Sequence, residues 1–457
     1  MTKKRVALAL MGIVLLASSC SGTPATPMPE KSAPVTGKAV FSQTITVPED
    51  GQVVLSLRAS APGASWQRQG AEAATVSVHV DGAYRADVVL FRGETPHTYD
   101  VLLGQMSKGS HRLDVRLEAA KSAAQAREAR VDEAAVRAYN AKHPLYLILA
   151  HAPILYGRED ARYSDTPLFM YYEVSGNTEL TTVQYTIIFS NEDGGTAADA
   201  LMGRWGRLTD IEWVYRAVVD QSGKAVRGEF QDKDHGTTIL TGKSDGRQPL
   251  LKNVTKNNLF ADSGTSSYRF ALAPLEALIA GSREEMMDLH PWMYQVMAEE
   301  WEREGQSQTE KTANPQTRAV SDPRNYLYVE FRSGPEPGLV CDAKLAFAAK
   351  LRGSDVWYSS DHGDDSLRIQ NNNGWRRGAI ELPPDTQADQ VEALRFTVYA
   401  GKQQPLCSLV VRDVRKVFLL GQDYVPGPSM LTWKGEQILS PDRATVHPDT
   451  FMIVLGK

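Results

Sequence analysis

Short runs of alternating apolar and polar residues are the feature that most restricts how this chain can fold. They recur in the first quarter of the 457-residue sequence, at Val53/Leu55/Leu57, Val76/Val78/Val80 and Leu113/Val115/Leu117. Alternation with a period of two predicts strands that bury one face. Turn signals separate the runs, at Glu49-Asp50-Gly51, Asp81-Gly82 and Lys108-Gly109. We therefore expect residues 39–118 to form an N-terminal β-sandwich.

The same alternation returns in the last third of the chain. It is visible at Leu327/Val329/Phe331, Phe396/Val398 and Leu409/Val411. It predicts a C-terminal β-sandwich over residues 324–457. Cys341 and Cys407 lie within this module. In an exported protein they could form a disulfide, and the alternative is two buried free thiols in separate strands.

The middle of the chain, residues 144–305, is expected to be a β-rich α+β domain. The apolar runs 145–150 and 183–189 predict strands, and the composition of 283–304 predicts a helix that kinks at Pro291. The predicted fold class is therefore mainly β with some α, in which two β-sandwich modules flank a central β-rich α+β domain.

Two segments between these modules are expected to be connections. Residues 119–143 begin with an Ala-rich, charged stretch free of Gly and Pro, which predicts a helical connector. Residues 306–323 are polar and lack large apolar side chains, which predicts a linker.

The first 19 residues have the pattern of a secretory signal peptide. A basic start, Lys3-Lys4-Arg5, precedes an apolar stretch over 6–16 that is too short to span a bilayer of about 30 Å. The following Leu-Ala-Ser-Ser-Cys at 16–20 resembles the lipobox of bacterial lipoproteins, with Ala17 where Leu is usual. An ordinary signal peptide followed by a chance cysteine is the alternative.

The lipoprotein resemblance implies that Cys20 is acylated and becomes the mature N-terminus. Its acyl chains would make the membrane a partner, and residues 20–38, rich in Ser, Thr and Pro, would form a flexible tether. The implied location is the bacterial cell envelope, facing the periplasm or the exterior. With 50 basic and 55 acidic residues, the chain is not expected to bind nucleic acid by neutralising phosphates.

The strongest candidate site is acidic and lies in the central block. Asp210 and Glu212 are two residues apart in a strand-like run, so they should share one face, and His235 follows on a nearby hairpin or strand. This set predicts a divalent-cation site, for Ca²⁺ or Mg²⁺ because the ligands are mainly oxygen atoms. The alternative is a structural strand whose carboxylates accept hydrogen bonds from Arg204, Arg207 or Arg216.

The segment 206–213, Gly-Arg-Leu-Thr-Asp-Ile-Glu-Trp, also resembles the G-x-x-D-W-E…H segment of Vps62-like proteins. The resemblance is local and differs at Ile211, where the family has Trp. It implies that Asp210, Glu212 and His235 hold a metal ion.

Further site candidates surround this motif. Glu192 and Asp193 lie in the Asn191–Thr196 turn, Asp165 precedes a Thr-Pro pair, and His151 follows the apolar run at 145–150. For each of them, a role in a turn or in packing is the alternative. In the C-terminal module, Trp357, Tyr358 and Trp375 could be core aromatics or a platform on which a sugar stacks.

No P-loop, G-x-S-x-G, H-E-x-x-H or dinucleotide-binding motif is present in the sequence. The stretch 108–117 resembles the last strand of many carbohydrate-binding sandwiches. Our hypothesis is an exported, lipid-anchored envelope protein that binds a ligand, a glycan, through its β-sandwich modules, with a divalent-metal site in the central domain. The alternative is a metal-dependent hydrolase that acts on envelope or carbohydrate substrates. A scaffold with acidic turns is a third possibility.

Overall fold

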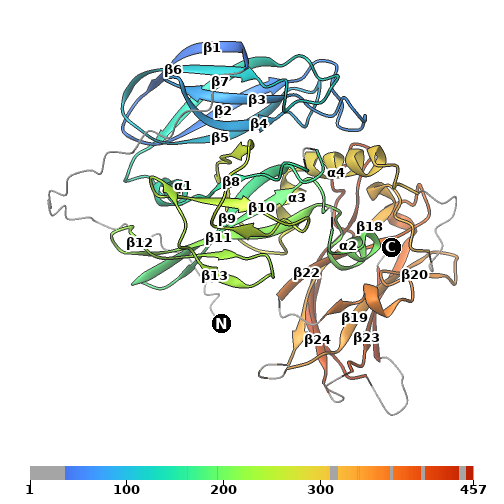
Figure 1. Cartoon of the computed structure of the whole chain (residues 1–457). Coiled ribbons are helices and arrows are strands. Elements are labelled where there is room, and N and C mark those ends of the chain that lie inside the picture. The colour runs from blue at the N-terminus through green and yellow to red at the C-terminus, as the bar shows by residue number, and fades with distance from the viewer. Residues whose placement is uncertain are drawn as a thin grey trace, which may run out of the picture. The chain divides into compact units, whose positions relative to one another are not determined.

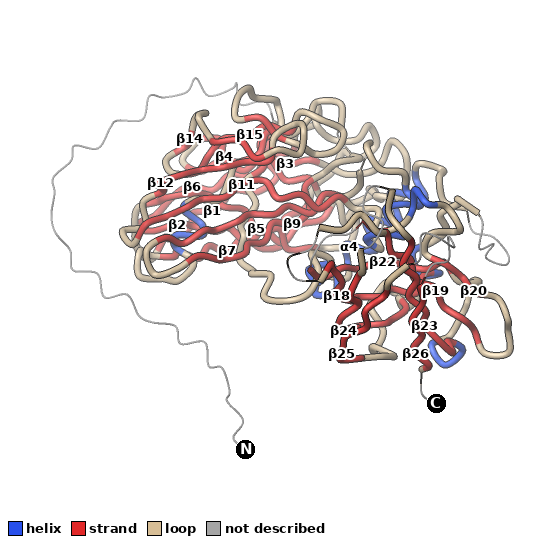
Figure 2. The backbone as a smooth tube through the Cα atoms, turned by 90° about the horizontal axis from the view of Figure 1, so that it is seen from below, coloured by secondary structure: helices blue, strands red, loops and turns tan. Residues whose placement is uncertain are grey.

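The computed structural model describes residues 37–161, 163–192, 194–308, 317–336, 338, 340–370, 374–402, 407–441 and 449–455. Strands are the predominant secondary structure of these residues and the helices are short (Figures 1 and 2), so the expected fold class is confirmed. The predicted signal peptide, Cys20 and nearly all of the tether lie outside the described residues. No described helix is long and apolar enough to cross a membrane.

The N-terminal part is built from two antiparallel sheets. The first has the order β1 (Lys38–Val47), β6 (Gly109–Leu117), β3 (Thr75–Val80) and β4 (Ala83–Val89). The second has the order β5 (His97–Met106), β2 (Gly51–Ser60) and β7 (Arg130–Tyr139). The alternating residues of β2, β3 and β6 are buried in one core, as the sequence predicts: Val53, Leu55, Leu57, Val76, Val78, Val80, Leu113 and Val115.

The prediction of a helical connector over 119–143 is wrong. Strand β7 occupies 130–139 and extends the N-terminal sandwich past residue 118. Ala134, Val136 and Ala138 lie opposite Leu57, Leu55 and Val53 of β2. These small residues cover an apolar strand, and this tertiary contact outweighs the intrinsic preference of alanine for helices.

The central part contains two further sheets. The longer one has the order β13 (Thr237–Ile239), β12 (Ala225–Gln231), β11 (Asp210–Asp220), β10 (Leu180–Phe189) and β9 (Pro167–Gly176). The other has the order β14 (Ser244–Asp245), β15 (Gln248–Asn253), β8 (Ile154–Tyr156) and β17 (Arg269–Phe270), and β16 (Phe260–Ala261) pairs with β15. Every neighbouring pair is antiparallel except β8 with β15.

Four helices accompany the central sheets: α1 (Tyr146–Ala150), α2 (Ala198–Trp205), α3 (Glu285–Leu289) and α4 (Trp292–Arg303). The strand predicted at 145–150 is wrong, because α1 lies there, and a short apolar run does not distinguish a strand from a buried helical turn. The break expected at Pro291 separates α3 from α4.

The C-terminal part is a second sandwich. One sheet has the order β22 (Gly374–Glu381), β18 (Tyr326–Pro335), β24 (Leu409–Leu419) and β25 (Trp433–Leu439). The other has the order β20 (Trp357–Ser359), β19 (Lys344–Leu351), β23 (Val391–Tyr399) and β26 (Asp449–Val454), and β21 (Ile369–Gln370) pairs with β19. Three short 3₁₀ turns are η1 (Pro323–Asn325), η2 (Asp365–Leu367) and η3 (Ala388–Gln390).

A disulfide joins the two sheets of this sandwich. Cys341 lies just before β19 and Cys407 just before β24, and their Cα atoms are 5.3 Å apart. The predicted alternating residues Leu327, Val329, Phe331, Phe396, Val398, Leu409 and Val411 are all buried between the sheets.

Strand β18 also connects the C-terminal sandwich to the central part. Its other face places Tyr326 and Tyr328 in the hydrophobic core that the N-terminal and central parts share. Tyr328 meets Tyr294 of α4 with ring centroids 5.7 Å apart. In the segment predicted as a linker, Val320 is also buried in this core, and residues 309–316 lie outside the described chain.

A buried arginine reinforces this connection. Arg377 of β22 is fully buried and donates to Asp288 of α3, Glu330 of β18 and the Tyr294 hydroxyl, at 2.5, 2.9 and 2.7 Å. Arg415 and Lys416 of β24 bind the same acidic group. Buried charges require such partners because removal of a charge from water is costly.

We predict that Arg377→Met lowers the free energy of unfolding by about 3 kcal/mol, because it leaves Asp288 and Glu330 with fewer positive partners in a dry setting. Arg412→Met is the matched control, since Arg412 pairs with the exposed Glu436 on the adjacent strand, and its cost should stay below about 1 kcal/mol. Urea unfolding measures both values. Equal small losses in the two variants would show that the Arg377 contacts do not hold α3 against the sandwich.

Candidate functional site

Strand β11 determines where the two predicted carboxylates lie. Asp210 is its first residue and pairs with Phe189, and Glu212 pairs with Ile187 of β10. Residues two apart in a strand point to the same face, as the sequence predicts for this pair. His235 lies in the turn between β12 and β13 of the same sheet, with a left-handed backbone at φ 61°.

Asp210, Glu212 and His235 line one cavity, which we call the acidic pocket. Its volume is about 370 Å³, and Glu192, a further sequence candidate, also lines it. The remaining lining residues are Gly195, Thr196, Trp205, Arg207 and Asn257. The fold thus brings Asp210, Glu212 and His235, predicted from the sequence as one set, into the same pocket as the separate candidate Glu192.

Asp210 is buried deepest, with 1% of its surface exposed. Its Oδ2 accepts a hydrogen bond from Asn258 Nδ2 at 3.1 Å, and Arg207 Nη1 lies 3.9 Å from Oδ1. The same Asn258 amide donates to Asp165 at 3.0 Å, and Asp165 pairs with Arg158 at 2.8 Å. Asp165 is therefore a neighbour that helps to orient Asp210, and it does not belong to the lining of the acidic pocket.

Two side-chain amides contact the ring of His235. Gln231 Nε2 lies 3.2 Å from its Nδ1, and Asn257 Nδ2 lies 2.9 Å from its Nε2. A metal ion at His235 would therefore have to displace one of these amides.

Glu192 is positioned by the loop that leads into α2. Its Oε1 accepts a hydrogen bond from the Thr196 backbone at 2.9 Å. Gly195 makes this close turn possible, because its φ is 104° and a Cβ there would lie 2.6 Å from the Asn257 side chain. Helix α2 then ends at Gly206, which places Trp205 and Arg207 on either side of the turn at the edge of the pocket.

The carboxylates of the pocket share a desolvated, negatively charged setting. Burial and the nearby Asp210 raise the pKa of Glu192 to about 7 and the pKa of Glu212 to about 8. Burial also raises the pKa of Asp210, and Arg207 opposes that shift. Near neutral pH the pocket therefore holds protons on side chains that are ordinarily ionised.

The distances between the possible ligand atoms of Asp210, Glu212 and His235 determine whether these side chains can hold a metal ion as they stand. Within the described ranges, one group of three acidic or imidazole side chains brings its ligand atoms within 4.8 Å of one another, and it is Glu285, Asp288 and Glu330. That group is occupied by the cations of Arg377, Arg415 and Lys416. Asp210, Glu212 and His235 are further apart, so a metal ion would have to draw them together.

Other sequence candidates lie elsewhere. His151 follows α1, is buried, and has its Nε2 3.2 Å from the Gly223 carbonyl, while burial lowers its pKa. It does not line the acidic pocket, so it fits the packing alternative. Asp193 lies outside the described residues.

The alternative for β11 was a structural strand whose carboxylates pair with nearby arginines, and one of the three arginines named there lies near a carboxylate. Arg207 lies near Asp210. Arg204 bonds the Ser366 carbonyl, and Arg216 bonds Gln184 at 2.7 Å and stacks on Trp213.

A neighbouring cavity of about 290 Å³ shares Trp205 and Arg207 with the acidic pocket. Its other lining residues are Ser282, Arg283, Glu284, Trp375, Arg376 and Arg377. Arg207 joins the two, because its Nε lies 3.1 Å from Glu284. An acidic and an arginine-rich hollow therefore adjoin, and both Trp205 and Trp375 are partly exposed there.

Trp205, Asn257 and Asn258 are not among the candidates predicted from the sequence. The Asn-Asn pair at 257–258 resembles an ordinary polar turn, and the left-handed φ of Asn258, 46°, is a conformation that asparagine tolerates. The pair reaches the pocket only through the pairing of β15 and β16. No short-range sequence signal marks that contact.

No known protein family and no curated protein matches this chain. Among solved structures, a sugar-binding protein, the EclA C-terminal domain, is similar at 16% identity and TM-score 0.18, over 22% of this chain and 68% of that one. The lectin POL of Pleurotus ostreatus, in its apo form, is similar at 9% identity and TM-score 0.12, over 89% of this chain and 87% of that one. Likeness at these scores establishes neither a shared fold nor a shared ligand.

We predict that the acidic pocket makes stability fall as the pH rises. Because the folded protein raises the pKa of Glu212 from 4.5 to about 8, the stabilisation from its protonated form is complete below about pH 4.5 and is lost as the pH rises through about 8. A tenfold change in proton affinity corresponds to about 1.4 kcal/mol, so a pKa rise from 4.5 to about 8 corresponds to a loss on the order of 5 kcal/mol. Urea unfolding between pH 5 and pH 9 measures it.

Glu212→Gln should remove much of this pH dependence, since a neutral amide replaces the protonated acid. Glu179→Gln is the control, because Glu179 is exposed in the β9–β10 hairpin at the other end of the sheet. The account fails if Glu212→Gln and Glu179→Gln leave the same slope.

Proposed function

We propose that the protein is an exported, lipid-anchored protein of the bacterial envelope that binds a glycan at the acidic pocket, with Ca²⁺ or Mg²⁺ as a bridging ion. The observation that carries this proposal is the gathering of Glu192, Asp210 and Glu212 in one concave site where burial and the charge of Asp210 raise the pKa of both glutamates. The described lining of the acidic pocket comes from the central part, and the C-terminal sandwich contributes Trp375 and Arg376 of β22 to the adjoining cavity.

The chemistry of the two adjoining cavities suits a polyhydroxylated ligand. Carboxylates accept hydrogen bonds from sugar hydroxyls, and Asn257 supplies both a donor and an acceptor. The indoles of Trp205 and Trp375 supply apolar faces on which a sugar ring can stack. The guanidinium groups of Arg283 and Arg376 suit an acidic sugar, because arginine binds carboxylates and similar anions through paired hydrogen bonds.

A divalent cation suits the acidic pocket for an electrostatic reason. Among the described residues, three carboxylates line the pocket, and Arg207, the one arginine of that lining, is already engaged with Glu284. Burial and repulsion from Asp210 keep Glu192 and Glu212 protonated, and a bound cation would offset both effects by pairing with the ionised carboxylates. Oxygen ligands favour Ca²⁺ or Mg²⁺, and such an ion can also bind neighbouring hydroxyls of a sugar.

Hydrolysis is the second candidate function, favoured by the pKa of Glu212. An acid with a pKa of about 8 is protonated at neutral pH and can donate to a leaving group, while an ionised neighbour acts as base. Turnover of an envelope glycan by the wild type, lost in Glu212→Gln with glycan binding retained, would favour hydrolysis. Glycan retention without any product favours binding alone.

We predict that the purified protein binds Ca²⁺ with an affinity that rises with pH. Because Glu192 and Glu212 must release protons first, affinity should increase at least about tenfold between pH 6 and pH 8.5, and binding should release protons. Calorimetry in two buffers of different ionisation enthalpy measures both quantities. The same titrations with Mg²⁺ identify the preferred ion.

Glu212→Gln should lower the affinity for Ca²⁺ by at least about tenfold at pH 8.5, the fold-change expected from losing one ligand carboxylate. Glu179→Gln should leave it unchanged. Ca²⁺ binding that is independent of pH and equal in both variants would place the ion elsewhere, and absence of binding would remove the cation from the proposal.

We predict that Cys20→Ser releases the protein from the membrane. Without the thiol no acyl chain can be attached, and the anchor depends on burial of its methylenes in the bilayer. Membrane fractionation of a bacterial expression host, with mass spectrometry of the N-terminus, measures this. Cys341→Ser is the control for loss of a cysteine, and an unacylated wild-type N-terminus would contradict the anchor.

A further inference from the structure

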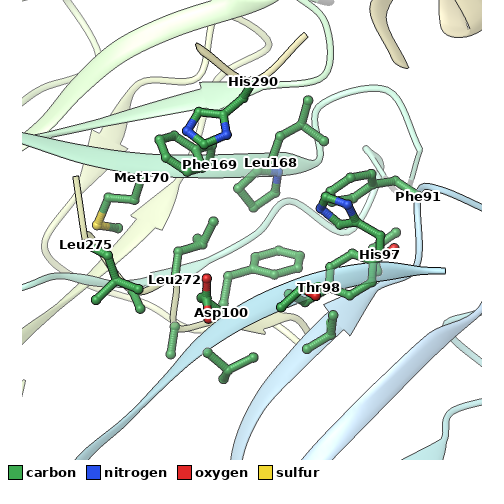
Figure 3. Close-up of a pocket in the computed structure, with 18 of the residues that line it drawn as sticks. Phe91, His97, Thr98, Asp100, Leu168, Phe169, Met170, Leu272, Leu275 and His290 are labelled. Atoms are coloured by element: carbon green, nitrogen blue, oxygen red, sulfur yellow. The ribbon is translucent and has the colours of Figure 1, made fainter. Parts of the chain in front are cut away.

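A second cavity, lined by aromatic and aliphatic side chains, lies apart from the acidic pocket, and we call it the junction pocket (Figure 3). Strands β4 and β5 of the N-terminal sandwich form one part of it, and β9 with residues 270–276 of the central part forms another. His290 and Trp292, at the break between α3 and α4, complete the lining. None of its lining residues lines the acidic pocket.

The walls of the junction pocket are held by backbone hydrogen bonds. Leu102 N donates to Ala271 O at 2.8 Å, and Ala273 N donates to Asp100 O at 3.2 Å, so β5 is paired with the segment that follows β17. Tyr172 N of β9 donates to Glu276 O at 3.0 Å. The cavity therefore exists before any ligand binds, which reduces the entropic cost of binding.

Aromatic rings from separate segments cluster in this lining. Phe91 stacks on Trp292 with centroids 5.3 Å apart, and Tyr99 meets Phe91 edge-on at 5.2 Å. Phe169 lies 4.5 Å from His290. Aromatic faces carry partial negative charge, and they attract organic cations as well as apolar groups.

The charges of the lining have one predominant sign. Asp87, Asp100 and Glu276 are carboxylates, and no lysine or arginine belongs to the described lining. Asp87 is already paired with Lys121 at 2.7 Å, and Glu276 with His290 at 3.0 Å. The cationic partner of Asp100 is weaker. Arg137 Nη2 lies 3.6 Å from Asp100 Oδ1, and the Arg137 side chain is about half exposed to solvent.

Asp100 is thus the carboxylate best placed to receive a positive ligand. Its Oδ1 accepts a hydrogen bond from Ser56 Oγ at 2.5 Å. Figure 3 shows Thr98 and Asp100 on one side of the hollow and Leu168, Phe169 and His290 on the other. His97 adds no repulsion near neutral pH, because burial lowers its pKa to about 4 and leaves it uncharged.

The size of the cavity limits the apolar part of a ligand. Its volume is about 170 Å³, close to the roughly 150 Å³ of an engineered protein cavity that binds benzene. A single ring or a short branched chain fills such a space.

We propose that the junction pocket binds a small organic cation, an ammonium group attached to one ring or a short alkyl chain. The ammonium group lies beside Asp100 and the apolar part lies among the aromatic and leucine side chains. This binding function is separate from the proposed glycan site and holds whether or not that site binds a glycan.

Three probes of nearly equal size test the charge requirement. They are 2-phenylethylamine, which is protonated at neutral pH, the neutral 2-phenylethanol and the anionic phenylacetate. Calorimetry on the wild-type protein should show the amine binding at least about tenfold more tightly than the alcohol, a margin within reach of an ion pair combined with cation–π contact. Phenylacetate should not bind measurably.

Variants of two residues locate the binding. Asp100→Asn keeps the shape of the side chain. It should lower the affinity for the amine to that for the alcohol, and it should leave the affinity for the alcohol unchanged. Thr98→Lys places a positive charge on the same wall and should abolish amine binding. Glu133→Gln is the control, because Glu133 is an exposed carboxylate of β7 in the same sheet, outside the lining.

Several outcomes would overturn the proposal. Equal affinity for the amine and the alcohol would show that charge is not recognised. An amine affinity lowered as much by Glu133→Gln as by Asp100→Asn would indicate a general surface effect. Failure of all three probes to bind at millimolar concentration, or binding of a methyl glycoside in their place, would also contradict it.

Discussion

The buried charge of Asp210 is the constraint around which the central site is organised. A carboxylate removed from water is stable only with partners, and the fold supplies the Asn258 amide and, at a greater distance, Arg207. These partners do not extend to the whole pocket. Glu192 and Glu212 respond by holding protons, so the cost of burying charge appears as raised pKa values. A site of this kind is poised to exchange protons for a cation, which links its architecture to its proposed chemistry.

The same constraint is met differently where the parts of the chain join. The acidic residues of α3 and β18 are paired with Arg377, Arg415 and Lys416, so that cluster is internally neutralised. It serves to hold α3 and α4 against the C-terminal sandwich. In the described lining of the acidic pocket, Arg207 is the one arginine or lysine side chain, and in the junction pocket Asp100 is a lightly paired carboxylate near aromatic rings. The contrast between complete and incomplete neutralisation separates the structural cluster from the two candidate binding sites.

Much of the fold follows from local sequence pattern. Period-two alternation predicts both sandwiches, and it does so because each strand buries one face against a facing sheet. The local pattern fails at β7. Ala134 and Ala138 favour a helix by intrinsic preference, but in the fold they lie opposite Leu57 and Val53 of β2 and belong to a strand. It also fails at α1, because a buried run of five residues has no period of its own. The error at β7 comes from contacts between residues distant in sequence, and the error at α1 comes from the ambiguity of a short apolar run.

The site was predictable to a similar extent. Spacing alone places Asp210 and Glu212 on one face of a strand, and a turn signal marks Glu192. Asn257 and Trp205 reach the pocket, and the buried Asn258 reaches Asp210, through sheet pairing and through the end of α2, which no spacing rule encodes. The tryptophan and arginine residues of the adjoining cavity come from separate elements of the chain. The junction pocket was not predicted, since its walls come from segments far apart in the sequence.

The fold holds protons on Glu192 and Glu212 of the acidic pocket near neutral pH. Carbon-13 NMR of the glutamate side-chain carboxyl carbons, followed against pH, observes this directly. The account predicts two carboxyl groups with apparent midpoints at about 7 and about 8, which disappear from the spectra of Glu192→Gln and Glu212→Gln respectively. If every glutamate titrates near 4.5, the ordinary value for this side chain, the pocket is solvated and the account is contradicted.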